Sequence, residues 1–231
     1  MMQKAYLNPT PDQTYELVGE GDYNFTKILA HSRLLEHEGK VEQACNERFH
    51  AFQRIEELLP DDEQINLEWA HQNSRAALEL IEASAVDHFL INDFELSAAL
   101  LELLLELDPE DHLEASILLA FDYAELQEWE SFDEVVEYVS EKSVERVLLD
   151  LYGTFRRRAT IEEKLLHTFR SRFAAYHAEF VAEQHAADAA YLQSIESEHP
   201  TKAALARELW FKTEPLWMLH PDFIAALRSA Q

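Results

Sequence analysis

Residues 92–97 read Asn92-Asp93-Phe94-Glu95-Leu96-Ser97, and a related stretch 35 residues later reads Gln127-Glu128-Trp129-Glu130-Ser131-Phe132. The positions around the two stretches correspond as well. In the first copy they are Ile81, Ser84, Ala85, His88, Phe94, Ser97, Leu101 and Leu104, and in the second they are Ser116, Leu119, Ala120, Tyr123, Trp129, Phe132, Val136 and Val139. Similarity at a fixed period of this size is typical of stacked helical hairpins, which usually present a binding surface rather than a reaction centre.

The composition favours an all-α protein. Alanine, leucine and glutamate are abundant, and all three are strong helix formers. The 231-residue chain holds only 4 glycines and 7 prolines, too few for a turn-rich β fold, and 47% of its residues are hydrophobic. That proportion is enough for a sizeable core. We therefore expect helices throughout and no β-strand.

The chain is strongly acidic, with 45 Asp and Glu residues against 19 Lys and Arg residues and a formal net charge of −26. Carboxylates in such excess repel nucleic-acid phosphates and anionic lipid headgroups, so we expect neither nucleic acid nor a membrane as a partner. They suit basic proteins or peptides instead. The alternative interpretation is that the charge only keeps the protein dispersed in solution.

The sequence favours the cytoplasm. Cys45 is the only cysteine, so the chain can form no internal disulfide, which fits a reducing compartment. The stretch Met1-Met2-Gln3-Lys4 has no apolar signal core, and no apolar run approaches the length that spans a membrane.

Proline, glycine and capping residues divide the chain into helices. We expect a tail over residues 1–21, helical hairpins over 22–144, and a long helix with an aromatic C-terminal cap over 145–231, all in one continuous domain. The expected helical segments are 23–37, 41–59, 60–91, 94–107, 111–126, 130–140, 143–158, a long helix that opens at Thr160, and short helices at 201–212 and 221–229.

The long helix carries an apolar seam. Leu166, Phe169, Phe173, Tyr176 and Phe180 recur at alternating spacings of three and four, as in a coiled coil. Such a seam needs a partner helix. The partner could lie in the same chain or in a second subunit, which leaves open a structural homodimer that assembles through residues 166–180.

The repeat resembles the tetratricopeptide repeat, in which W-x2-L-G-x2-Y precedes a turn and A-x3-F and then Pro follow it. The first copy supplies Ser97-x3-Leu101 and Pro109, and the second supplies Leu119-Ala120-x2-Tyr123 and Phe132-x3-Val136. A weaker third match is Gly39-Lys40-Val41-Glu42-Gln43-Ala44. The period of 35 instead of 34 departs from the family pattern, as does the large Phe132 at a position where a small residue is usual.

This resemblance implies a right-handed array of antiparallel helical hairpins, followed by the long helix and by C-terminal capping helices. It also implies a protein-interaction scaffold whose concave groove holds a peptide or a helix. Four polar residues are our candidates for the groove: Asp87, Asn92, Asp122 and Glu125. Because residues 78–126 contain no Lys or Arg, we expect the groove to bind a basic or amphipathic segment and not an acidic tail.

A second surface is basic. The segment 142–172 holds eight Lys and Arg residues against four acidic ones, a net charge of +4 in a chain whose remainder carries −30. The candidate docking patch for an acidic partner consists of Arg156, Arg157, Arg158, Arg170 and Arg172. The alternative is that these arginines pair with carboxylates of the same chain.

Catalysis has little support in the sequence. We find no catalytic residue set, no phosphate loop and no nucleophile elbow, and we expect no cofactor. On a continuous helix, His177, His185 and Asp188 fall in one sector, which leaves a metal-dependent helical-bundle enzyme as an alternative. Those three residues need further ligands from another helix to close a metal site. Our main prediction is therefore a non-enzymatic cytoplasmic scaffold that binds a protein or peptide.

Overall fold

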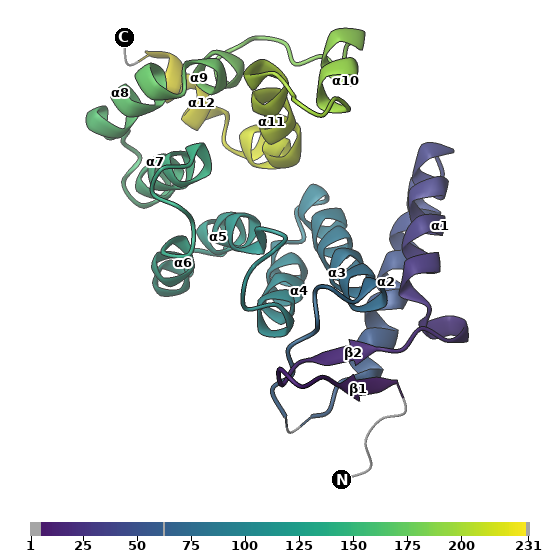
Figure 1. Cartoon of the computed structure of the whole chain (residues 1–231). Helices are drawn as coiled ribbons and strands as arrows, with labels where there is room; N and C mark the ends of the chain where they lie inside the picture. Colours follow the sequence, from purple (N-terminus) through teal and green to yellow (C-terminus); the bar gives the residue numbers. More distant parts are fainter. Residues whose placement is uncertain (1–5, 62, 230–231) are drawn as a thin grey trace. The chain divides into compact units, whose positions relative to one another are not determined.

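The protein is all-α, as the composition predicts. The computed structural model describes residues 6–61 and 63–229, and within them it contains one small β-hairpin and twelve α-helices (Figure 1). The helices are α1 (Phe25–His37), α2 (Val41–Leu58), α3 (Gln72–Leu90), α4 (Phe94–Leu107), α5 (Ala115–Leu126), α6 (Trp129–Val136), α7 (Val144–Arg158), α8 (Glu163–Arg172), α9 (Ala174–Phe180), α10 (Ala189–Ile195), α11 (Lys202–Leu219) and α12 (Pro221–Ser229).

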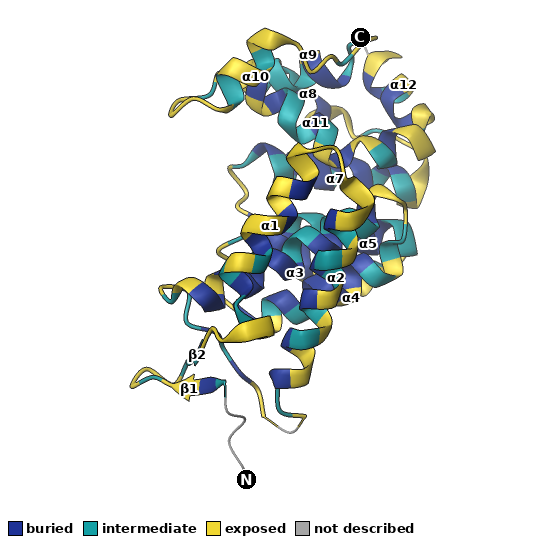
Figure 2. Ribbon diagram, turned by 90° about the vertical axis from the view of Figure 1, so that its right-hand side faces the viewer, coloured by how far each residue is buried: buried dark blue, intermediate teal, exposed yellow. Residues whose placement is uncertain are grey.

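The chain forms two compact units. Unit 1 comprises Met1–Phe89 and Asp93–Asp122, and unit 2 comprises Leu90–Asn92 and Tyr123–Gln231. In unit 1 the helices α1 and α2 form an antiparallel hairpin, and α3 contributes the largest share of the core (Figures 1 and 2). In unit 2, α7 pairs with α8, and α11 packs against α9. The two units are described separately below.

The sequence repeat corresponds to a repeated turn. Asn92 and Gln127, which occupy the same place in the two copies, have left-handed backbones with φ of 64° and 60°. The next amide in each copy donates to an equivalent carbonyl, Asp93 to His88 and Glu128 to Tyr123, and both N···O distances are 2.9 Å. A left-handed residue just after a helix satisfies carbonyls that the helix itself leaves unpaired.

The weaker third match has the same turn. Gly39 has a φ of 74°, and the amide of Lys40 donates to the carbonyl of Leu35 at 2.8 Å. Glycine adopts this conformation without the steric cost that a side chain adds. Three helical hairpins therefore share one turn geometry, which is the property expected of a helical repeat fold.

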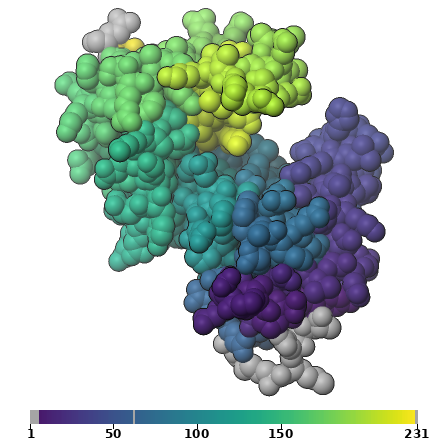
Figure 3. Space-filling model, viewed as in Figure 1, coloured from purple at the N-terminus to yellow at the C-terminus, as the bar shows by residue number. Residues whose placement is uncertain are grey.

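The expected N-terminal tail contains a β-hairpin, so the prediction that the chain has no strand is wrong. Strand β1 (Leu7–Pro9) pairs antiparallel with β2 (Tyr15–Leu17), and Leu17 is fully buried. Helix α3 anchors the hairpin, because the Ser74 hydroxyl accepts from the Leu17 amide and the Asn73 amide donates to the Leu17 carbonyl, both at 2.9 Å. Figure 3 shows the hairpin, in purple, against the blue surface of later residues of unit 1. Residues 1–5 of the expected tail lie outside the described residues.

The helix expected from Pro60 begins only at Gln72. Residues 63–71, which precede it, are not helical, and Ile65 and Leu67 among them are buried. The Leu67 amide donates to the carbonyl of Leu107 at 2.8 Å, at the end of α4. The Leu67 amide is therefore bonded to the end of α4 and not within a helix.

The large Phe132, unusual for its repeat position, packs against a glycine. Phe132 is buried on α6, and a Cβ built on Gly153 of α7 would lie 2.6 Å from the tip of its ring. The small residue that lets two helices approach is therefore supplied by α7 instead of by α6. Gly153 lies inside a helix, where glycine costs about 1 kcal/mol relative to alanine, and this contact accounts for its presence.

The single long helix predicted from Thr160 is interrupted. Helix α8 ends at Arg172, Phe173 adopts a non-helical backbone, and α9 extends only to Phe180. In a straight helix, Phe169 and Phe180 would lie about 16 Å apart along the axis. The break brings their ring centroids to 5.9 Å, so that both aromatic side chains enter one core. Burial of two large rings favours two short helices over one long helix.

No helix in the described part of the chain is both long and apolar enough to cross a membrane.

Candidate functional site

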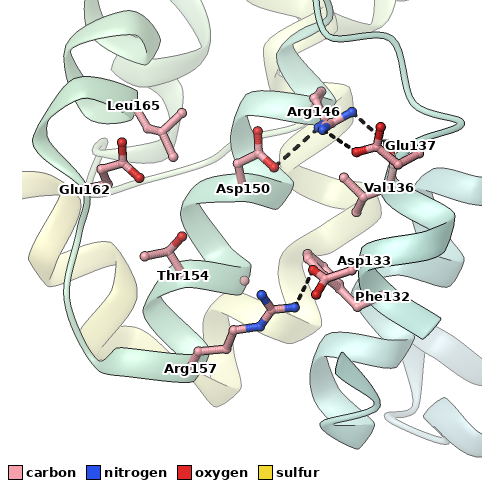
Figure 4. Close-up of a pocket in the computed structure, with 11 residues that line it drawn as sticks. Phe132, Asp133, Val136, Glu137, Arg146, Asp150, Thr154, Arg157, Glu162 and Leu165 are labelled. Carbon is pink, nitrogen blue, oxygen red and sulfur yellow. Dashed lines mark hydrogen bonds and ion pairs between the residues drawn. The ribbon is translucent and has the colours of Figure 1, made fainter. Parts of the chain in front are cut away.

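A charged pocket of about 420 Å³ lies within unit 2, among α6, α7 and the start of α8 (Figure 4). Its apolar residues come from the packing of these helices, and its polar residues carry six formal charges. The lining residues are Phe132, Asp133, Val136, Glu137, Arg146, Asp150, Gly153, Thr154, Arg157, Glu162 and Leu165.

Arg146 closes one end of the pocket. Its guanidinium donates to Glu137 at 3.0 Å and to Asp150 at 3.3 Å, and also to the carbonyls of Val136 and Val139 at 3.0 and 3.2 Å. The side chain is largely buried, so these four bonds hold it in one orientation. Since every bond reaches back to α6, the following segment or α7, Arg146 fixes the geometry of the pocket and does not project from it.

Arg157 closes the other end. Its guanidinium donates to Asp133 at 2.5 Å and to the carbonyl of Trp129 at 3.3 Å. It also lies over two aromatic rings, 4.7 Å from the centroid of Trp129 and 5.2 Å from that of Phe132. Arginine stacks readily on aromatic faces, and this arrangement holds its charge next to a single carboxylate.

Asp150 and Glu162 make the middle of the pocket acidic. Figure 4 shows both side chains around the space that Thr154 and Leu165 also face. Burial raises the pKa of Asp150, and the nearby Arg146 opposes that effect without cancelling it. No ion pair joins Glu162 to another residue of the described chain. With four carboxylates against two guanidinium groups, the pocket has a formal charge of −2 and suits a cationic group.

The four candidate groove residues do not form an open acidic surface. Asp87 accepts two hydrogen bonds from the guanidinium of Arg48, at 2.9 and 3.1 Å. Asp122 is fully buried, and the Ser97 hydroxyl donates to it at 2.7 Å. Both of these acids hold unit 1 together. Asn92 is exposed in the turn after α3, and its left-handed backbone forms that turn.

Glu125, the fourth candidate, belongs to a polar network in unit 2. It accepts hydrogen bonds from the Tyr152 hydroxyl and the Arg156 guanidinium, and the ring of His220 lies 3.0 Å from its carboxylate. The Glu125 side chain is only 7% exposed. Burial and the neighbouring Glu125 raise the pKa of Tyr152, which stays a neutral donor. These contacts make Glu125 and Arg156 a structural pair.

The five arginines of the candidate docking patch have different surroundings. Arg156 lies in the network around Glu125, and Arg157 lies in the charged pocket. Arg158 is exposed at the end of α7, and Arg172 donates to the carbonyl of Lys142 at 2.8 Å. Arg170 is half-buried against α12. The described structure therefore does not bring the five together as one uniform basic surface.

The three residues of the metal alternative have separate partners. His177 accepts a hydrogen bond from Arg170 at 3.3 Å, whereas the ring of His185 stacks on Trp210 with centroids 3.6 Å apart. Asp188 caps α10 by accepting from the amide of Tyr191. The helix that would have aligned the three ends at Phe180. Across residues 6–61 and 63–229, no group of three or more His, Cys, Asp or Glu side chains is arranged to hold a metal ion.

The apolar seam is largely covered within unit 2. Leu166, Phe169 and Phe180 are buried, and Phe180 contacts the rings of two tryptophans of α11. Phe173 and Tyr176 are half-exposed and line a second pocket, of about 570 Å³. At Phe180 the seam packs against α11 of the same chain.

Sequence reasoning missed Asp150 and Glu162 as site residues. In the sequence they are only two of the four acidic residues in the basic segment 142–172. The spacing of Arg146 and Asp150, four residues apart on a helix, is the one local signal of their ion pair. Nothing in the spacing of Glu162 indicates that it faces the same pocket, because it follows a left-handed turn at Ala159.

No protein-family model matches this chain, and neither a curated protein nor a solved structure shows significant similarity to it.

Proposed function

We propose that this protein is a tetratricopeptide-like interaction scaffold and that its charged pocket holds a basic side chain of a protein or peptide partner. The main support for the proposal is that the carboxylates around the 420 Å³ pocket outnumber the guanidinium groups by two. The partner segment is basic or amphipathic, in keeping with the net charge of −26. The role is one of binding, without catalysis.

The repeated turns support the scaffold part of the proposal. Helical repeat proteins expose extended surfaces, and the side chains on those surfaces determine which partner binds. The turns at Gly39, Asn92 and Gln127 share their backbone geometry, as expected when one supersecondary unit recurs. The departures from the family pattern, such as Phe132, affect packing and leave the surface free to vary.

The chemistry of the pocket supports a cationic ligand. A lysine or arginine side chain could place its charged end between Asp150 and Glu162 and its methylene groups against Val136 and Leu165. Arg146 and Arg157 are already paired with carboxylates, so they would not repel the incoming charge as strongly as unpaired cations would. Charge complementarity of this kind contributes to specificity and to the rate of association.

A peptide-binding assay tests the proposal. The probe is a fluorescein-labelled amphipathic helix with lysines on its polar face, and the readout is fluorescence anisotropy at 150 mM salt. Glu162→Lys reverses one charge at the pocket and should weaken binding at least tenfold. Glu198→Lys makes the same change in net charge at an exposed position of unit 2 outside the pocket and should change affinity less than twofold.

The two variants separate a specific site from general attraction to an acidic protein. If Glu162→Lys and Glu198→Lys weaken binding equally, the peptide is held by net charge alone and the pocket is not the site. A version of the peptide with glutamate in place of lysine should not bind. Tight binding of that peptide would contradict the predicted charge of the partner.

A further inference from the structure

A small pocket in unit 2 gathers cationic side chains and no carboxylate among the described residues. It has a volume of about 380 Å³, and its lining consists of Arg170, His177, Val181 and Arg228. These residues come from α8, α9, the residue after α9, and α12. In a chain with 45 acidic residues, a pocket without one is unusual.

Arg170 is the centre of the pocket. Its Nε donates to His177 at 3.3 Å, and one of its terminal nitrogens donates to the carbonyl of Leu227 at 3.3 Å. A guanidinium has five N–H donors, so three remain for another acceptor. The two bonds point the group toward α9 and α12 and fix its plane.

Arg228 approaches from α12. Its Nε donates to the carbonyl of Val181 at 3.0 Å, and a terminal nitrogen donates to that of Ala182. These are carbonyls at the C-terminal end of α9, where the helix dipole favours a cation. Arg228 is exposed, and neutral carbonyl acceptors hold it at the edge of the pocket without neutralising its charge.

The surroundings of Arg170 differ from those of comparable arginines in the described part of unit 2. The partly buried Arg146, Arg156 and Arg207 each form an ion pair with at least one carboxylate. Arg170 is also partly buried, but only an imidazole and a carbonyl accept from it. Burial of a charge without a counter-ion is unfavourable, so a bound anion would stabilise this arrangement.

We infer that this pocket binds a phosphate group, either as free inorganic phosphate or as a phosphomonoester on a peptide. Both guanidinium groups line this pocket, and each is held through its Nε and one terminal nitrogen, which leaves three N–H donors on each for the oxygens of a tetrahedral anion. The site is separate from the charged pocket, and no lining residue is shared between the two. It does not depend on the proposed binding of a basic segment.

His177 is the imidazole neighbour of Arg170 in the lining of the pocket. Burial lowers the pKa of the His177 imidazole, and the charge of Arg170 lowers it further. The neutral ring accepts the hydrogen bond from Nε of Arg170 and so helps to hold the guanidinium in place.

Isothermal titration calorimetry of the full chain with inorganic phosphate tests the inference, at pH 7 and low ionic strength. The expected result is saturable binding to one site, although the net charge of the protein opposes general anion binding. Arg170→Gln and Arg228→Gln should each weaken binding about tenfold or more, the effect of losing charge-assisted hydrogen bonds. Arg158→Gln makes the same charge change at an exposed residue outside the pocket and should change affinity less than twofold.

Two further arms complete the test. Arg170→Lys keeps the charge but loses the planar fork, so a folded Arg170→Lys protein should bind phosphate more weakly than the parent, even if Arg170→Gln fails to fold. A short phosphoserine peptide should compete with inorganic phosphate, and its unphosphorylated form should not. Absence of saturable phosphate binding, or equal loss of affinity in the Arg158→Gln control, would overturn the inference.

Discussion

Replacing Gly153 by alanine tests the contact between α6 and α7. The new Cβ would lie 2.6 Å from Cζ of Phe132 and 2.9 Å from Cε1, whereas carbon atoms in favourable contact are about 3.5–4.0 Å apart. The ring would have to withdraw by about 1 Å. Its movement is restricted on two sides, because the ring of Trp129 packs against it at a steep angle and Arg157 covers its face.

The change in the free energy of unfolding follows from two opposing effects. Overpacking of this kind costs about 1–3 kcal/mol, and replacing a glycine inside a helix by alanine contributes about 1 kcal/mol in the other direction. We therefore expect Gly153→Ala to lower the free energy of unfolding by about 1 kcal/mol, within a range of about 0–2 kcal/mol. Without the contact to Phe132, the same substitution would raise it by about 1 kcal/mol.

Urea denaturation monitored by tryptophan fluorescence measures this change. A double-mutant cycle with Phe132→Leu isolates the contact, because the smaller side chain leaves space for the new methyl group. The two substitutions should be coupled favourably by at least about 1 kcal/mol, as expected for residues in direct contact. If Gly153→Ala alone is more stable than the parent, or if the coupling is near zero, the packing argument for the repeat is refuted.

Three other predictions concern unit 2. Arg156→Met should lower the free energy of unfolding by about 3 kcal/mol in urea denaturation, because it leaves the buried Glu125 carboxylate without its guanidinium. Gln127→Gly should raise it by about 0.5–1 kcal/mol, since glycine adopts the left-handed turn more readily, and an unchanged midpoint would contradict this. Burial opposes ionisation of Glu179, yet hydrogen bonds from Arg207 and His185 lower its pKa below the ordinary value of 4.5. Its ion pair therefore stabilises the fold above about pH 4.5 and loses that effect as pH falls through the lower folded-state pKa, so the destabilisation by Arg207→Gln in urea titrations should be larger at pH 7 than at pH 3.

The sequence predicts helices best where local signals mark both ends. The expected helix 143–158 corresponds to α7, whose N-cap Ser143 accepts from the amide of Arg146. The break expected between residues 126 and 130 matches the turn at Gln127, because α5 ends at Leu126 and α6 begins at Trp129. Capping and periodicity act within a few residues, so they can be read from the chain alone.

The sequence predicts poorly where distant residues decide the local structure. Strands β1 and β2 are each three residues long, too short for an alternating pattern, and one of them contains Pro9. The partners that hold β2 in place are Asn73 and Ser74, more than fifty residues away. The break at Phe173 has the same kind of cause, because it depends on how two aromatic rings meet the core of unit 2.

The candidate site was only partly predictable for a related reason. Composition identified a basic segment and an acidic remainder, but it could not show which charges neutralise each other. Arg157 pairs with Asp133, 24 residues earlier, and Arg156 pairs with Glu125, 31 residues earlier. Only two cations of the basic segment, Arg146 and Arg157, line the pocket, so its excess charge is negative although the segment 142–172 is positive in sequence.

The most direct test of the scaffold account is a backbone amide NMR titration of the full chain with the lysine-rich amphipathic peptide. The account predicts saturable chemical-shift changes that concentrate at Asp150, Thr154 and Glu162 and that disappear in Glu162→Lys. Small, non-saturating changes spread over acidic residues throughout the chain, or no changes near these three residues, would contradict it.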